Sequence, residues 1–331
     1  SFPEYGKLSG RKINELQEGT RLDTRAEKRR PEDFALWKRA DPEHIMRWSS
    51  PWGEGFPGWH IECTAMAIKY LGANFDIHGG GLENVFPHNE CEIAQSEALS
   101  GESFANFWLH AGSLTVSGVK MSKSLGNSVT IQDALSEYPP EVIRMFVLSS
   151  HYRSPIDYSK EAVDGAYKGW QRLIGPALLV QQILLTTQDS DTPKDNLSST
   201  IKQTRDDFNA AMDDDFNAPK AIACLFDFAK DVNGLLSEYP RPDDATLHSI
   251  AEVYNDLAGT VLGLLPANST SSVNRDNELI EILVELRKTA RDQKDFATSD
   301  SIRDKLAAVG VTLEDGQSGT TWKTGFSKLS E

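Results

Sequence analysis

The sequence has few cysteines, no long apolar run and a shortage of positive charge, and each shortage excludes a class of protein. Three cysteines in 331 residues do not supply a disulfide scaffold, so we expect a reducing compartment, the cytoplasm. No apolar run approaches the roughly 20 residues of a membrane span, and the polar N-terminus does not resemble a signal peptide. A net charge of −15 opposes non-specific nucleic-acid binding, and no DNA partner is expected.

Two lysines three residues apart stand in the segment Lys120-Met121-Ser122-Lys123-Ser124. Such a segment can close on a polyphosphate, because lysines act as mobile point charges while hydroxyl and backbone N–H groups donate hydrogen bonds. The segment therefore indicates an enzyme that uses a nucleotide.

A cysteine, a histidine and a glutamate upstream of this loop suit a metal ion. His88 and Glu92 are four residues apart, so on a helix they share one face. Cys63 precedes them, and thiolate, imidazole and carboxylate groups all bind zinc. Taken singly, each is an ordinary packing or surface residue; together they predict one Zn²⁺ per chain, with a coordination position left open. Cys91, which points off the shared face, is expected to pack in the core.

A short strand is predicted at residues 75–78, ending in a turn of three glycines, Gly79, Gly80 and Gly81. Glycines let a backbone approach a flat or phosphorylated ligand closely, although most glycine triplets are only turns. Trp59 and His78 flank the predicted metal ligands. Their rings could close a small amino-acid pocket. On the plainer interpretation, Trp59 packs in the core and His78 makes a hydrogen bond at the end of the strand.

Spacing of apolar residues predicts the other elements. Helices are expected at 59–70, 89–99, 141–149, 159–185 with a break at Pro176, in several segments between the polar linkers 186–199 and 267–276, and in two segments within 277–308. A strand is expected at 107–116, and a β tail at 309–331. Thr130 and Asp133 form a capping box that begins a further helix.

The motifs together resemble those of cysteinyl-tRNA synthetases, a family of class I aminoacyl-tRNA synthetases. The resemblance runs over essentially the whole chain. It is carried by the lysine segment and by Gly58-Trp59-His60-Ile61-Glu62-Cys63, Phe75-Asp76-Ile77-His78-Gly79-Gly80-Gly81, Phe86-Pro87-His88, Glu92-Ile93-Ala94-Gln95-Ser96 and Ser149-Ser150-His151-Tyr152-Arg153-Ser154-Pro155.

The resemblance implies roles for these residues. Zinc is expected on Cys63, His88 and Glu92, and the cysteine substrate beside Trp59 and His78. Lys120 and Lys123 are the expected catalytic residues. The expected ATP-binding residues are Lys123, Gly79, Gly80, Gly81, Met121, Ser122 and Ser124.

The resemblance also implies a fold. We expect an α/β fold, a partial nucleotide-binding (Rossmann-like) catalytic domain with a connective segment and the lysine loop at residues 1–158. An α-helical bundle of the anticodon-binding type at 159–266 and a small C-terminal domain at 277–331 should follow. Trp322 either stacks on a base or packs in that small domain.

The chain departs from the family pattern at several points. Asn89 stands where the family usually has a second histidine, and Cys91 stands where it usually has asparagine. The His-Ile-Gly-His motif and a further zinc cysteine, which the family carries in its N-terminal part, do not occur. We therefore expect that an N-terminal part is missing and that the intact zinc site has a fourth protein ligand.

The expected function is ATP-dependent activation of L-cysteine, with Mg²⁺, and its transfer to tRNA(Cys), with zinc selecting the substrate thiol. The chain as given is expected to be an incomplete enzyme. Two alternatives remain: a cysteine ligase that couples cysteine to an amino sugar, and a non-catalytic tRNA-binding fragment. No membrane partner is expected.

Overall fold

The structure, a computed structural model, describes residues 2–12, 28–30, 32–121, 126–186, 197–237, 242–266, 273–316 and 319–324. The chain divides into two compact units, residues 1–113 with 153–155 and residues 114–152 with 156–331. Among the described residues, no helix is both long enough and apolar enough to cross a membrane.

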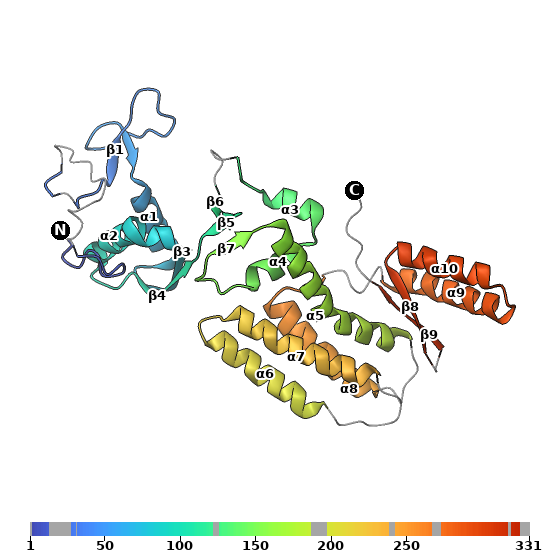
Figure 1. Ribbon diagram of the computed structural model, residues 1–331. Helices are drawn as coiled ribbons and strands as arrows, with labels where there is room; N and C mark the ends of the chain where they lie inside the picture. The colour runs from blue at the N-terminus through green and yellow to red at the C-terminus, as the bar shows by residue number, and fades with distance from the viewer. Residues whose placement is uncertain are drawn as a thin grey trace. The chain divides into compact units, whose positions relative to one another are not determined.

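In its described part, the first unit combines two short sheets with two α-helices and two shorter helical turns (Figure 1). Its elements are β1 (Trp37–Arg39), β2 (Gly55–Pro57), α1 (Trp59–Leu71), β3 (Phe75–Gly81), the helical turns η2 (Leu82–Asn84) and η3 (Val85–Asn89), α2 (Glu90–Ser100) and β4 (Ala105–Ala111). Strands β1 and β2 pair antiparallel, β3 and β4 pair parallel, and α1 packs against α2.

Both helices of this unit end at glycines with positive φ. Gly72, with φ 97°, ends α1, and Gly101, with φ 75°, ends α2. In each case the glycine N–H bonds a carbonyl four residues back, which satisfies a group that the helix end leaves unpaired. The predicted helices at 59–70 and 89–99 are thus confirmed to within a residue at each end.

The glycine run is not a turn, as the sequence had suggested, but the second half of β3. Gly79, Gly80 and Gly81 pair with residues 109–111 of β4. In the same register His78 faces Trp108, and Gly80 faces His110. Alternate residues of a strand share a face, so His78 and Gly80 lie on one side of the sheet. The local sequence pattern did not predict this half of the strand, because the partner of the glycines in β4 lies 30 residues further along the chain.

The predicted strand at 107–116 is in fact two strands in two units. It breaks after β4, and β5 (Leu114–Val116) belongs to the second unit. There β5 lies between β6 (Val119–Lys120), antiparallel, and β7 (Ile156–Tyr158), parallel. Helix α3 (Ile131–Glu137) begins at the predicted capping box, and α4 (Pro140–Leu148) begins at the second proline of the pair Pro139-Pro140.

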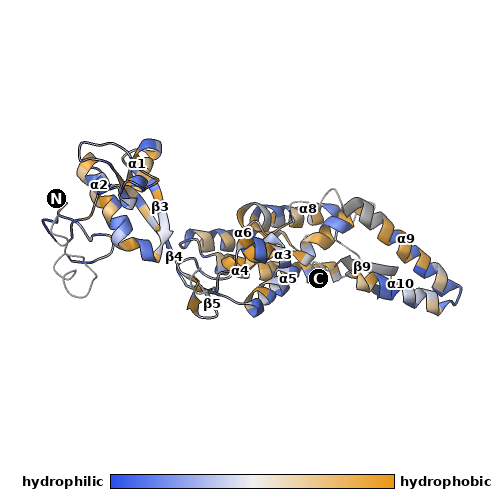
Figure 2. Cartoon of the chain, turned by 90° about the horizontal axis from the view of Figure 1, so that it is seen from above, coloured by the Kyte–Doolittle hydropathy of each residue, from blue (hydrophilic) through white to orange (hydrophobic). Residues whose placement is uncertain are grey.

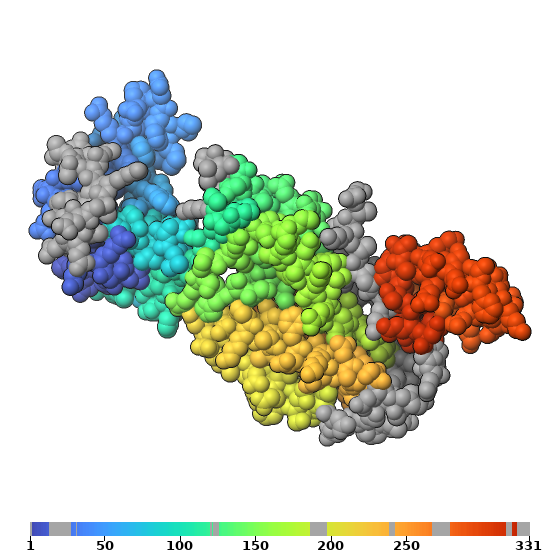
Figure 3. All heavy atoms as spheres, in the orientation of Figure 1, coloured from blue at the N-terminus to red at the C-terminus, as the bar shows by residue number. Residues whose placement is uncertain are grey.

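A helical bundle makes up most of the second unit. It consists of α5 (Lys160–Thr186), α6 (Ser198–Asp213), α7 (Ala218–Ser237) and α8 (Asp244–Val253), continued by η5 (Tyr254–Val261). Figure 2 shows polar and apolar residues alternating along these helices, as amphipathic elements require. In Figure 3, helices α6, α7 and α8 form one closely filled body. Trp170, Leu225 and Ile250 are fully buried in its core.

Pro176 does not break α5, contrary to the sequence expectation. A proline inside a helix removes one backbone hydrogen bond and disfavours the preceding turn. Ile174 and Ala177 beside it are buried in the bundle core. The helix stays continuous because its apolar face is buried on both sides of the proline. The sequence rule that proline breaks a helix considers only neighbouring residues and therefore cannot include this burial.

The C-terminal residues fold around a small core of their own. Helices α9 (Val273–Asp292) and α10 (Phe296–Ala308) pack together, and strands β8 (Val311–Gly316) and β9 (Gly319–Thr324) form an antiparallel pair. Trp322 is buried in this core, and its Nε1 donates to Glu281 at 2.8 Å. The packing interpretation of Trp322 is confirmed, and the base-stacking one is wrong.

Candidate metal centre

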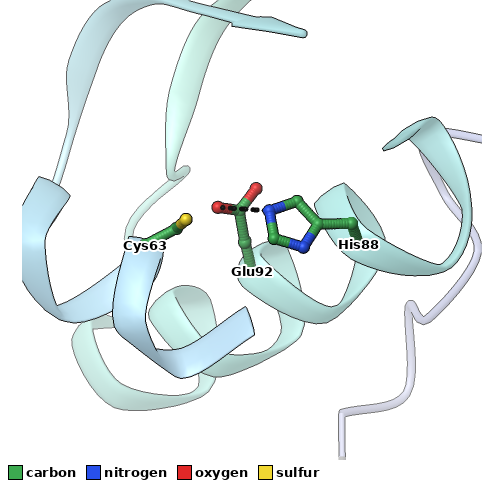
Figure 4. A group of neighbouring side chains, drawn as sticks. All are labelled: Cys63, His88 and Glu92. Carbon is green, nitrogen blue, oxygen red and sulfur yellow. Dashed lines mark ion pairs between the residues drawn. The ribbon is translucent and has the colours of Figure 1, made fainter. Parts of the chain in front are cut away.

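Three residues, each from a different helical element, converge in the first unit. Cys63 lies on α1, His88 in η3 and Glu92 in the first turn of α2. Their ligand atoms all lie within 4.8 Å of one another. Figure 4 shows the three side chains pointing toward one another, with an ion pair between His88 Nε2 and Glu92 Oε1 at 3.4 Å. The structure therefore brings together the three residues that the sequence singled out.

The carboxylate of Glu92 is fully buried yet held in its charged form. Burial raises its pKa, but hydrogen bonds from His78 and Asn89 outweigh that and hold the pKa below the ordinary value. Both bonds reach the same oxygen, Oε2: from Asn89 Nδ2 at 2.8 Å and from His78 Nε2 at 3.0 Å. Its position in the first turn of α2 also places it at the positive end of the helix dipole.

The other oxygen, Oε1, is buried and has no hydrogen-bond partner among the described residues. A buried carboxylate oxygen left without a donor is costly, so its presence points to a cation at this place. Cys63 Sγ and His88 Nε2 face the same space, and a sulfur, nitrogen and oxygen donor set suits zinc. The residues present fit a zinc ion.

The thiol of Cys63 needs a cation in order to ionise near neutral pH. Burial raises its pKa, and the carboxylates of Glu92 and Glu62 raise it further. Metal binding must therefore release a proton from this group. Cys91, as expected, belongs to the core, where it is 1% exposed and lies 3.4 Å from the hydroxyl of Tyr5.

Two aromatic residues predicted to line a pocket border the metal residues. The ring of Trp59 lies 4.3 Å from that of His88, centroid to centroid, and the Trp59 side chain is 59% exposed. His78 touches Glu92 from the strand side, through the hydrogen bond to Oε2. An exposed indole on one side and an imidazole on the other are suited to enclose a small substrate at the metal.

The predicted ATP-binding residues are only partly described. The backbone of Lys120, in β6, pairs with Thr115 of β5, and Met121 is half-buried. Ser122, Lys123 and Ser124 lie outside the described residues. Lys120 and Met121 belong to the second unit, whereas Gly79, Gly80 and Gly81 belong to the first.

Sequence reasoning missed three residues that support the metal ligands. His60 Nδ1 lies 2.7 Å from His88 Nδ1, and burial, with the neighbouring His88, lowers the pKa of His60. Asn89 holds Glu92, as described above, and His110 on β4 holds Asn89 at 3.1 Å. His60 lies within a motif already singled out and Asn89 directly follows another, so the sequence could have indicated both. The approach of His110 depends on the pairing of β3 with β4.

Comparison with known proteins agrees with this architecture. A family model described as "tRNA synthetases class I (C) catalytic domain" matches residues 1–168, and one described as "DALR domain" matches residues 207–266.

Among curated proteins, the cysteine–tRNA ligase of Chlorobaculum tepidum is 48% identical, over 97% of this chain and 66% of the relative. The one of Deinococcus radiodurans is 48% identical, over 98% of this chain and 65% of the relative. The one of Thermococcus onnurineus is 45% identical, over 97% and 68%. The chain thus spans about two thirds of the length of these relatives.

Proposed function

The chain belongs to the cysteine–tRNA ligase family of class I tRNA synthetases, and we propose that it takes part in activating L-cysteine with ATP and transferring it to tRNA(Cys). The observation that carries the proposal is the convergence of Cys63, His88 and Glu92 beside the exposed ring of Trp59. The group offers a thiol-selective metal site next to a surface that a small amino acid can reach.

Cysteine poses a problem of discrimination that such a site addresses. Cysteine and serine differ by one atom, and shape alone discriminates such groups by about 1–3 kcal/mol. Zinc, when bound, prefers a thiolate to a hydroxyl and favours the ionised form of a thiol. Cys63, His88 and Glu92 would hold the zinc, and Trp59 and His78 would orient the amino acid. A separate editing site is then unnecessary.

Activation requires the cysteine carboxylate to attack the α-phosphate of ATP, with release of pyrophosphate. No covalent enzyme intermediate is needed, so the chain contributes positioning and charge stabilisation. Lys123, with Lys120, would neutralise the charge that develops on the pyrophosphate, together with Mg²⁺. Met121, Ser122 and Ser124 would supply backbone and hydroxyl donors to the phosphates. Separately, Gly79, Gly80 and Gly81 would let a nucleotide approach the backbone of β3 closely.

The second half of the chain suits the tRNA. The DALR match at 207–266 lies in the helical bundle, within the predicted 159–266 segment. We propose that this bundle, with the small domain at 277–331, binds tRNA(Cys), and that residues 1–158 carry the chemistry. The reaction is expected in the cytoplasm, as the scarcity of cysteine suggests.

Cysteine-dependent exchange of pyrophosphate into ATP tests the proposal on the 331-residue chain. The same assay is run on a version extended at the N-terminus by the part that is expected to be missing. We expect that longer form to exchange with cysteine, and far more slowly with serine at equal concentration, whereas the 331-residue chain should show little exchange. Zinc and tRNA(Cys) binding without exchange in either form would favour the tRNA-binding alternative. Exchange that an amino sugar, but not tRNA, converts into a cysteine amide would favour the amino-sugar ligase.

Replacement of Lys123 tests the loop separately. Lys123→Ala removes the charge expected on the pyrophosphate and should lower the exchange rate by a factor of about 10² or more, as the loss of one preorganised electrostatic group does. Zinc content should stay at the parent value. Lys202→Ala, an exposed lysine paired with Asp206 on α6, is the control. Equal, measurable exchange rates for Lys123→Ala and the parent, both in the N-terminally extended form, would refute the role of Lys123.

A further inference from the structure

The two oxygens of Glu92 have different surroundings. Oε2 accepts two hydrogen bonds, from Asn89 and from His78. Oε1 accepts none from the described residues and faces the space shared with Cys63 and His88. One oxygen is held by two hydrogen bonds, whereas the other has only the His88 ring 3.4 Å away and no hydrogen bond from the described residues. Such a carboxylate is prepared to bind a metal ion through one oxygen only.

The carboxamide of Asn89 can adopt only one orientation here. The side chain is 1% exposed, so water does not supply its partners. The ionised oxygen of Glu92 accepts but cannot donate, so the NH₂ group of Asn89 must face it. The carbonyl Oδ1 then faces Nε2 of His110 at 3.1 Å.

His110 is thereby assigned its tautomer. A carbonyl oxygen only accepts, so Nε2 of His110 must carry a hydrogen and donate it. The resulting series runs from β4 through the start of α2 to the ligand: His110 donates to Asn89, and Asn89 donates to Glu92. Each member leaves the next with a single allowed orientation.

We propose that Asn89, oriented by His110, is a positioning residue that directs Oε1 of Glu92 at the metal and keeps Oε2 out of its coordination sphere. This inference rests on the zinc site of the proposed function. It also gives a role to Asn89, which stands where the family usually has a second histidine. The carboxamide of Asn89 donates to Glu92 and accepts the hydrogen that His110 supplies.

Zinc affinity of the 331-residue chain, measured by competition with a chromophoric chelator, tests the proposal. Asn89→Leu keeps the size of the side chain and removes both hydrogen bonds, so zinc should bind about 10–100-fold more weakly, as after loss of other groups that orient metal ligands. His110→Phe keeps the ring and removes the donor, so it should weaken binding in the same direction.

The double variant distinguishes a series from two separate effects. If His110 acts through Asn89, then His110→Phe should cause no further loss in the Asn89→Leu background. Asn89→His restores a donor beside Glu92 and should recover most of the affinity. Asn106→Leu is the matched control, because Asn106 also donates and accepts through its carboxamide, but to Asn74 at an exposed site.

The visible absorption of bound Co²⁺ reports the coordination of the metal and does not change when a variant is only less stable. Co²⁺ in place of zinc absorbs visible light more strongly at low than at high coordination number. Without Asn89, Oε2 keeps only the hydrogen bond from His78 and is less restrained from joining the coordination sphere. The absorption of Asn89→Leu should therefore fall, and thermal melting without metal identifies any unfolded variant. If Asn89→Leu does not fold, His110→Phe and Asn89→His carry the test.

The outcomes separate this inference from the function on which it rests. A parent chain that binds no zinc would remove the metal site, and this inference with it. A parent that binds zinc, with Asn89→Leu and His110→Phe of equal affinity and unchanged cobalt spectra, would overturn the inference alone. Additive losses from the two substitutions would also overturn it, since His110 would then not act through Asn89.

Discussion

At the scale of single residues, the candidate site depends on a few buried polar groups whose partners come from different elements. Glu92 shows this most clearly: it is fully buried, doubly hydrogen-bonded at one oxygen, and directed at Cys63 and His88 with the other. Leaving a buried charge so arranged is unfavourable unless a cation completes it. The geometry is therefore most economically explained as a metal site.

Replacing Cys63 by serine should abolish zinc binding. A hydroxyl is a harder and far less acidic ligand than a thiol, so the loss should exceed the roughly 10–100-fold expected for a group that only orients a ligand. Zinc content after dialysis, with affinity from chelator competition, measures the effect. Cys224→Ser, on α7 of the second unit, is the control and should retain zinc. Retention of zinc by Cys63→Ser would exclude the thiol as a ligand.

The sequence predicted the ligands but not their support. The four-residue spacing of His88 and Glu92 is a property of the helix itself and can be read locally. The convergence of Cys63 depends on the packing of α1 against α2, which spacing does not reveal. His110 was missed because it reaches Asn89 only once β4 has paired with β3.

At the scale of elements, local signals predicted the start and end of helices better than their continuity. The capping box at Thr130 and Asp133 was predictable, because both of its hydrogen bonds lie within four residues. The passage of α5 through Pro176 and the strand character of Gly79–Gly81 were not predictable. The first depends on burial in the bundle and the second on a partner strand in β4.

The C-terminal elements contain an ion pair that makes their stability depend on pH. Arg287, 3% exposed, binds Asp315 with two hydrogen bonds of 2.9 Å, and Arg291 adds a third. The Arg287 guanidinium, with help from Thr320, holds the pKa of Asp315 well below its ordinary value. The stabilisation is therefore present above the unfolded pKa of about 3.9 and is lost as the pH falls toward the lower folded pKa.

Asp315→Asn should therefore destabilise strands β8 and β9 at pH 7 and have less effect at pH 3. Because the Asp315 side chain is 43% exposed, solvent screening limits the loss at neutral pH to about 1 kcal/mol. Hydrogen exchange of the β8 and β9 amides, corrected for intrinsic rates, measures it at both pH values. Asp304→Asn, an exposed aspartate of α10, is the control. An equal effect of Asp315→Asn at both pH values would contradict the assignment.

At the scale of the whole chain, the resemblance of the motifs predicted the family, which the comparisons confirm. Tertiary packing determines which side chains are accessible to an RNA partner. Trp322 was a candidate for RNA contact on residue type, and Arg287 is a basic residue of the same small domain. Arg287 is engaged by Asp315, and Trp322 by Glu281 inside a small core. Composition and motif cannot distinguish a buried arginine from a free one, because the difference arises from tertiary packing.

The net charge of −15 makes a prediction about nucleic-acid partners. A chain so acidic can hold tRNA only through local basic contacts, so binding should depend on the shape and sequence of tRNA(Cys) rather than on phosphate charge alone. Duplex DNA should bind at about 0.15 M salt with Kd no tighter than about 10⁻⁴ M, the weak end of non-specific binding. Fluorescence anisotropy with labelled tRNA(Cys), a non-cognate tRNA and a DNA duplex, each at several salt concentrations, measures this. Equal affinities for the three would mean that a non-specific basic surface, and not a tRNA-specific one, governs binding.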